Sequence, residues 1–300
     1  MNKINSDFIF VFLLSSLLWY LYVRFNILHF PNEYLNLFNQ YNENSFIGPI
    51  KYRILIPEIV FWLKKLNIKI LHSFIIVLYF IFIFSITQLF IFYKLIFSNN
   101  KSKIALIISS IFIITTYLDH ILQPWSYLDI GLYSLTYSLL LKKYKYSQFL
   151  FFLVCILAIL NRETGIFIPV LIIIDCIIKK AGIRRLIFGF TLILINILIL
   201  FLLRKIKGYD SSEDINRIFV QWNWNTNIPN LIFYLTLFFV IGGPFLFPTK
   251  VQYINFKSIF ILFLLFLPFY FVYGNWIEIR VLLPFTPLYS IILIDKLKFD

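Results

Sequence analysis

Carboxylates, arginines and one histidine stand in short polar segments between long apolar runs, where they could bind a phosphate and move a proton. The candidates are Glu33, Arg53, Asp119, His120, Arg162, Glu163, Glu278 and Arg280. An arginine side chain matches a phosphate through two parallel hydrogen bonds. A carboxylate can take a proton from an attacking hydroxyl group. These residue types therefore predict a site for an anionic substrate, provided that the fold brings them to one face.

Each candidate also has a structural interpretation, which the sequence leaves open. Glu33 could be a solvated loop acid, and Asp119-His120 could form a hydrogen-bonding group at a helix end. Arg162-Glu163 could be a structural ion pair, while Glu278 and Arg280 could anchor a helix at the membrane interface. No metal-binding motif is present, although carboxylates from separate loops could meet around a divalent ion. The cofactor therefore stays unknown.

The composition predicts that these polar segments connect membrane-spanning helices. Of the 300 residues, 61% are hydrophobic and only 14% are charged, whereas a soluble domain is about 25% charged. The net charge is +13, and the basic residues lie between apolar runs, as the positive-inside rule expects. We therefore interpret the charge as a topology signal and expect no nucleic-acid partner. The whole chain, 1–300, is predicted to be one all-α transmembrane domain.

Ten membrane segments are predicted, and two of them form a hairpin of short helices. The run 146–178 would be about 50 Å long as one helix, too long for a single span. The polar tetrad 161–164 interrupts it, followed by Gly165 and Pro169, so we expect two short helices that meet at the tetrad. The other segments are 8–28, 70–97, 104–122, 126–141, 186–203, 230–248, 257–273 and 281–295.

This arrangement places both termini on one side of the membrane, taken as cytoplasmic, and the candidate residues on the other. The side of the termini then holds 15 of the 27 Lys and Arg residues but only four of the 14 acids. The segment 52–65 is too short and too charged to span, so we expect an amphipathic helix on the outer surface. Asp129 and Asn161 fall with the candidates on the outer face. The lack of a processed leader favours a bacterial inner membrane, although an endoplasmic reticulum membrane is also compatible.

Four segments resemble the GT-C class of polytopic membrane glycosyltransferases, which take sugars from polyprenyl-phosphate donors. They are HFPNEY (29–34), KYRILIPE (51–58), NRETGIFIP (161–169) and WIEIRVLLPFTPLY (276–289). The resemblance implies a GT-C-like fold, an outward-facing site, and a polyprenyl-phosphate-linked sugar and membrane lipid as partners. It further implies that Glu33 is the catalytic base and that Arg53, Arg162 or Arg280 binds the lipid phosphate. Glu163, Glu278, Asp119 and His120 complete the expected substrate-binding set.

Three other functions remain open from the sequence. A polysaccharide polymerase that joins lipid-linked repeat units would use a similar cavity but rely more on arginines. A lipid-linked oligosaccharide flippase or other transporter would tend to show an internal repeat and polar residues at the membrane midplane. Neither feature is evident in the sequence, which disfavours a transporter. A non-catalytic membrane scaffold would tolerate replacement of all the outer acids. The oligomeric state stays unknown.

Overall fold

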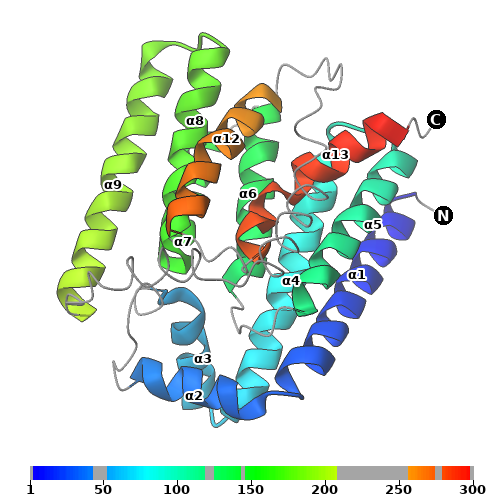
Figure 1. Ribbon diagram of the computed structural model, residues 1–300, viewed down its shortest axis with the longest axis vertical. Coiled ribbons are helices and arrows are strands. Elements are labelled where there is room, and N and C mark those ends of the chain that lie inside the picture. Colours follow the sequence, from blue (N-terminus) through cyan, green and yellow to red (C-terminus); the bar gives the residue numbers. More distant parts are fainter. Residues whose placement is uncertain are drawn as a thin grey trace, which may run out of the picture.

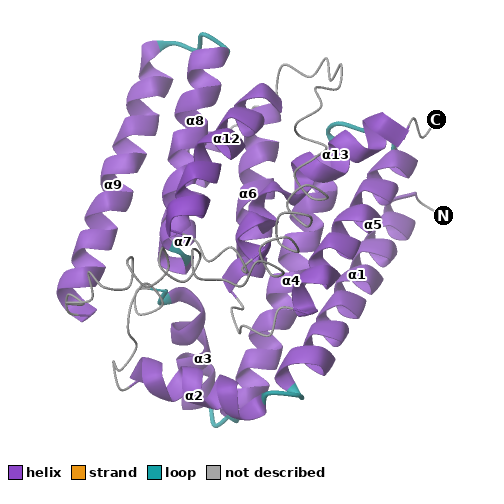
Figure 2. Ribbon diagram, in the orientation of Figure 1, coloured by secondary structure: helices purple, strands orange, loops and turns teal. Residues whose placement is uncertain are grey.

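The structure, a computed structural model, describes residues 3–42, 53–118, 125–142, 146–207, 256–273 and 279–297. In these ranges every regular element is a helix, so the all-α prediction is confirmed for the described part of the chain (Figure 2). The predicted segment 230–248 lies outside the described residues.

The α-helices run up and down through an elongated bundle (Figure 1). They are α1 (Lys3–Tyr22), α2 (Pro31–Asn42), α3 (Leu55–Lys65), α4 (Ile70–Lys94), α5 (Asn99–Thr115), α6 (Trp125–Leu141), α7 (Ser147–Asn161), α8 (Phe167–Ile178), α9 (Ile183–Lys207), α12 (Phe256–Tyr273) and α13 (Thr286–Leu297). The start of α1 and the end of α13 lie at the same end of the bundle, which we call the termini end. The opposite end carries α2 and α3, and we call it the hairpin-tip end.

Helix α4 lies at the centre and contacts α1, α3, α5 and α6. It approaches α6 closely at Gly131, where an added Cβ would lie 2.6 Å from the ring of Phe84. The Ser85 hydroxyl then donates a hydrogen bond of 2.7 Å to the backbone oxygen of Tyr127. A glycine and a serine at one crossing are typical of helices packed inside a membrane, where small residues allow the backbones to come together.

Three described helices are long and apolar enough to cross a membrane, namely Ser6–Ile27, Ile70–Lys94 and Ile183–Lys207. The first of these includes a π-helical turn, η1 (Val23–Ile27). Large apolar side chains remain exposed on the outside of the bundle, among them Phe8 at 71% on α1 and Leu194 at 67% on α9. Such surfaces are compatible with a lipid environment. The count of ten membrane segments stays a prediction.

The predicted hairpin of short helices is present. Helix α7 ends at Asn161, a 3₁₀ turn η4 (Glu163–Ile166) follows, and α8 begins at Phe167. Arg162 joins them in an extended conformation, with φ −162° and ψ 147°. The break therefore falls on the polar tetrad, as its residue types predict.

The amphipathic helix predicted over 52–65 is also present, as α3. Its residues Ile56, Pro57 and Val60 are buried, whereas Trp62 is 63% exposed. The helix lies at the hairpin-tip end and contacts α4 and α7 (Figure 1).

Two elements differ from the predicted ones. The segment 281–295 is not one α-helix, because a 3₁₀ helix η5 (Ile279–Phe285) with Pro284 inside it precedes α13. Proline lacks an N–H and clashes with the preceding turn, which ends a regular α-helix. The polar stretch 29–53, whose composition predicts an outer loop, contains the helix α2. Pro31 at its first position and Glu33 in its first turn both favour a helix start.

Candidate functional site

Five polar residues meet in a cluster at the hairpin-tip end of the bundle. Arg53 comes from the residues just before α3, Asp129 from α6, and Asn161, Arg162 and Glu163 from the end of α7 and the start of η4. The break between α7 and α8 therefore places three consecutive polar residues against two other parts of the fold. The structure brings together three of the predicted site residues, Arg53, Arg162 and Glu163.

Arg53 lies under the surface, with 8% of the residue exposed. Its Nε is 3.5 Å from Oε2 of Glu163, and its guanidinium carbon lies 5.1 Å from the ring centroid of Trp125. A guanidinium group is attracted to the face of an aromatic ring, most strongly to tryptophan. Trp125 and Glu163 thus hold Arg53 between α6 and η4.

Arg162 is even more buried, at 4% exposure. Its Nη1 donates a hydrogen bond of 3.1 Å to the Ser126 hydroxyl and lies 3.8 Å from Oδ2 of Asp129. Both partners belong to the first two turns of α6. The 3.8 Å ion pair is too long for a hydrogen bond, so Arg162 and Asp129 interact only by charge.

Asn161 attaches the hairpin to α6. Its Nδ2 donates to the backbone oxygen of Trp125 at 2.9 Å and to Oδ1 of Asp129 at 2.7 Å. The Tyr133 hydroxyl on the same helix donates to the backbone oxygen of Thr164 at 2.8 Å. These bonds bridge α6 and the tip at successive turns, so the position of the two arginines depends on this contact.

Several oxygen atoms of the cluster could still take a hydrogen bond from a ligand. Four buried oxygens in or directly beside the cluster form no hydrogen bond with the described residues: Oδ2 of Asp129, Oδ1 of Asn161, Oε1 of Glu163 and Oγ1 of Thr164. Buried polar atoms are nearly always hydrogen-bonded in folded proteins, and exceptions gather at functional sites. The cluster thus combines guanidinium groups, which suit an anion, with acceptor oxygens, which suit hydroxyl donors.

Glu163 is the carboxylate partner of Arg53, and Asp129 is that of Arg162. An anion that enters the cluster must therefore replace one of these carboxylates beside its arginine. The Glu163 side chain is 24% exposed, compared with 1% for Asp129. Glu163 is therefore the more accessible of the two acids. Its contact with Arg53 joins one nitrogen and one oxygen at 3.5 Å, which is weaker than the paired hydrogen bonds that arginine forms with a phosphate.

The other predicted site residues are placed less fully. Glu33 is exposed in the first turn of α2, and among the described residues no hydrogen bond or ion pair links its side chain to the cluster. Asp119, His120 and Glu278 lie outside the described residues, and for Arg280 only the backbone, in η5, is described. Among the described side chains no three His, Cys, Asp or Glu residues form a group that could hold a metal ion.

Trp125 and Ser126 belong to the cluster but were not predicted. Neither residue type stands out at the start of an apolar helix, because aromatic and hydroxyl side chains are common there. Asp129 did carry a signal, since an acid inside an apolar helix is expensive and usually has a partner. Trp125 lies four residues before Asp129, on the same face of α6. The acid could therefore have identified Trp125 as a neighbour of the cluster.

Comparison with known proteins leaves the cluster to be interpreted from its own chemistry. No family model, curated protein or solved structure matches the chain.

Proposed function

We propose that the chain is an integral membrane glycosyltransferase of GT-C type, which moves a hexosyl or pentosyl group from a polyprenyl-phosphate donor. The acceptor is a glycan, a lipid or a protein on the outer face of the membrane. The observation that carries the proposal is the buried cluster in which Arg53 and Arg162 lie beside acceptor oxygens at the hairpin-tip end. A sugar phosphate presents both an anion and several hydroxyl donors, so its chemistry is complementary to such a cluster.

The proposed placement is a cell membrane, with the termini end in the cytoplasm of a bacterium. Three apolar helices of sufficient length and the exposed apolar faces of α1 and α9 support a membrane. Exposed basic residues are described at both ends of the bundle, among them Lys180 and Arg184 at the termini end and Lys64 and Lys65 at the hairpin-tip end. The predicted topology places 15 Lys and Arg residues on the side of the termini and 12 on the other, and because basic residues favour the cytoplasmic side, this count supports an outward-facing hairpin tip.

In the proposed reaction the arginines act on the leaving group. The bond between the anomeric carbon and the phosphate oxygen breaks, and the polyprenyl phosphate keeps the electron pair. Arg53 and Arg162 would stabilise the negative charge that grows on that oxygen. Their burial makes this stabilisation larger than it would be in water.

Glu33 is proposed as the base that takes the proton of the acceptor hydroxyl. It lies exposed on α2, at the same end of the bundle as the cluster (Figure 1). Glu163 is already engaged by Arg53, which suits it better to hold that arginine than to accept a proton. The acceptor oxygen attacks the anomeric carbon from the side opposite the phosphate, so the product has the inverted configuration.

A lipid-linked polysaccharide polymerase is the second candidate, and one observation favours it. The cluster contains two buried arginines, whereas among the described residues no hydrogen bond or ion pair links the proposed base Glu33 to it. A polymerase would bind the diphosphate of a lipid-linked repeat unit with those arginines and would not need Glu33.

The test is a mass-spectrometric comparison of lipid-linked sugars and surface glycans in a deletion strain. The strain carries the wild-type gene, Glu33→Ala, Arg53→Gln or Arg24→Gln, the last being an exposed arginine that serves as the control. The proposal predicts that deletion removes one sugar from the glycan and accumulates its polyprenyl-monophosphate form. Wild type and Arg24→Gln should restore the sugar, while Glu33→Ala and Arg53→Gln should not.

Three other outcomes of this experiment would each contradict a different part of the proposal. Accumulation of complete repeat units on polyprenyl diphosphate would identify a polymerase or a flippase. Restoration by Glu33→Ala would show that this carboxylate is not the base. Unchanged lipid-linked sugars and glycans in the deletion strain would contradict a role in glycan synthesis.

A further inference from the structure

We propose that the termini end carries a binding site for an anionic phospholipid, formed by four basic residues that surround the buried Asp175. We call these residues, Lys142, Lys180, Arg184 and Lys257, the basic patch. The site rests on the proposed membrane placement but not on the transferase reaction, so the two proposals can fail separately.

Asp175 joins the ends of three helices at this end of the bundle. It is fully buried, and its Oδ1 lies 2.7 Å from Nζ of Lys179 at the end of α8. The same oxygen accepts a hydrogen bond of 3.1 Å from Ser258 of α12. Its Oδ2 lies 3.4 Å from Nη2 of Arg185 in the first turn of α9. Lys179 also donates to the backbone oxygen of Leu140 in α6 at 3.1 Å.

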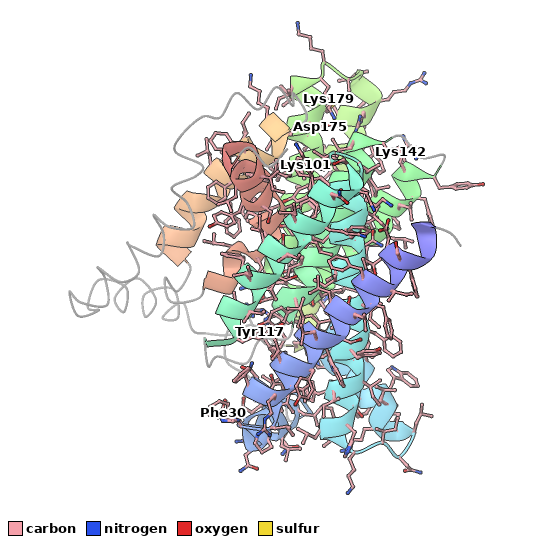
Figure 3. All side chains as sticks on the ribbon, turned by 90° about the vertical axis from the view of Figure 1, so that its right-hand side faces the viewer. Phe30, Lys101, Tyr117, Lys142, Asp175 and Lys179 are labelled. Atoms are coloured by element: carbon pink, nitrogen blue, oxygen red, sulfur yellow. The ribbon has the colours of Figure 1, made fainter. Side chains whose placement is uncertain are left out.

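Each partner of Asp175 has an exposed basic residue as its direct neighbour in sequence. Lys180 follows Lys179, Arg184 precedes Arg185, and Lys257 precedes Ser258; all three basic side chains are exposed. Lys142 adds a fourth, two residues after Leu140. Figure 3 shows Lys142, Asp175 and Lys179 together at this end. The contacts of Asp175 and Lys179 thus bring together the ends of four helices, each with an exposed basic residue in or next to it.

The acids described at this end do not neutralise Lys180, Arg184 and Lys257 of the basic patch. Asp175 is engaged with Lys179 and Arg185, and Asp7 with Lys94 at 2.8 Å and Lys103 at 3.0 Å. Within the described residues Lys180, Arg184 and Lys257 form no ion pair. Their charge is therefore open to an external anion.

The start of α9 increases the attraction for an anion. Its first turn contains Arg184 and Arg185 and no acid, although the N-terminus of a helix already has a partial positive charge. The preceding turn is fixed, because the N–H of Ala181 donates to the oxygen of Cys176 at 2.9 Å. In this turn Lys180 adopts a left-handed conformation, with φ 48°. Arg185 is paired with Asp175, whereas Lys180 and Arg184 form no ion pair within the described residues, so their charges add to the positive potential at the start of α9.

An apolar stripe on α9 begins beside these charges and indicates that the anion belongs to a lipid. Ile183, Ile187, Phe190 and Leu194 are 66%, 56%, 52% and 67% exposed. Their spacing places them on one face of the helix. Exposed apolar side chains continue along α9 beyond them, among them Leu198 at 55% and Phe201 at 52%, so the helix offers an apolar surface along which an acyl chain can lie. A phospholipid has both parts, an anionic headgroup for the basic patch and an acyl chain for the stripe.

The experiment measures binding of a fluorescent phosphatidylglycerol to the purified full-length protein in detergent. Unlabelled phosphatidylglycerol, phosphatidylcholine and inorganic phosphate are the competitors. The variant Lys180→Gln/Arg184→Gln/Lys257→Gln removes three charges of the patch. The matched control, Lys64→Gln/Lys65→Gln/Lys69→Gln, removes three exposed lysines at the opposite end of the bundle.

We expect only unlabelled phosphatidylglycerol to compete well. Each neutralised patch residue should weaken binding about fivefold, the factor that corresponds to about 1 kcal/mol per basic residue near an anionic surface. The triple variant should therefore bind roughly a hundredfold more weakly, and the control should keep wild-type affinity. If the triple variant does not fold, the three single substitutions test the same expectation, each with a fivefold loss.

Four results would overturn the inference. Equal competition by phosphatidylcholine would mean that only the apolar stripe binds, and equal competition by inorganic phosphate would indicate a simple anion site. Equal weakening of binding in the control would show that total charge matters and not the patch. Wild-type affinity in a folded patch variant would show that these residues do not bind the lipid.

Discussion

Substitution of Gly165 by alanine should displace the hairpin tip and reduce activity. A Cβ at this position would lie 2.4 Å from the backbone carbon of Ala158, and 2.6 Å from both its oxygen and the nitrogen of Ile159. All three are backbone atoms of α7, which cannot rotate out of the way as a side chain can. Ordinary van der Waals contact begins at 3.4 Å, so η4 and α7 must separate by about 1 Å.

This displacement would act directly on the arginine cluster. The N–H of Gly165 donates to the oxygen of Arg162 at 2.9 Å, so the two residues move together. Overpacking of this kind costs about 1–3 kcal/mol of the free energy of unfolding. A misplacement of about 1 Å at a site can lower a rate about a hundredfold. We therefore expect a folded, destabilised protein with about 1% of the wild-type transfer activity.

The assay combines thermal unfolding in detergent with quantification of the restored sugar in the deletion strain. Gly182→Ala is the matched control, because an added Cβ there meets nothing within 4 Å. It should be neutral, or stabilising by up to about 1 kcal/mol, with full activity. If Gly165→Ala were as stable and active as Gly182→Ala, the close approach of η4 to α7 would be refuted.

Three further substitutions test the buried polar contacts. Asp129→Leu should lower the free energy of unfolding by about 3–5 kcal/mol, because Arg162 is left as a buried charge without its carboxylate. The double variant Asp129→Leu/Arg162→Met should recover most of this free energy but should have no activity. Ser290→Ala removes a 2.7 Å hydrogen bond to Ser109 and should cost about 0.6 kcal/mol, the average for such bonds between membrane helices. Asp175→Asn should lower the unfolding temperature while activity is retained at permissive temperature, because its ion pairs lie at the termini end; loss of activity in a protein as stable as wild type would contradict that placement. Thermal unfolding in detergent and sugar restoration in the deletion strain measure all three.

Much of the helical framework could be predicted because its signals are local. Uninterrupted apolar runs identify α4 and α9, and the tetrad 161–164 identifies the break between α7 and α8, since polar residues and glycine rarely continue an apolar helix. Helix α2 was missed because its composition is polar, and its start signals at Pro31 and Glu33 occur in loops as well. The 3₁₀ helix η5 was missed because an apolar run around Pro284 also fits a kinked α-helix.

The cluster could be predicted only in part, because its contacts join distant segments. Arginines and acids in an apolar chain attract attention by their cost alone, which is how Arg53, Arg162 and Glu163 were found. Which residues of α6 face them depends on how that helix is rotated and packed against the hairpin. The contacts of Arg53 with Trp125 and of Arg162 with Ser126 follow from that packing. Periodicity within one segment does not contain this information.

The most direct test of the central proposal is equilibrium binding of a short-chain polyprenyl phosphate to the purified protein in detergent. Wild type should bind it saturably, and the matching polyprenol without phosphate should not compete. Arg53→Gln/Arg162→Gln should lose this binding, whereas the exposed-arginine variant Arg24→Gln should keep it. Equal binding by wild type and a folded Arg53→Gln/Arg162→Gln protein would contradict the assignment of this cluster to the phosphate of the donor.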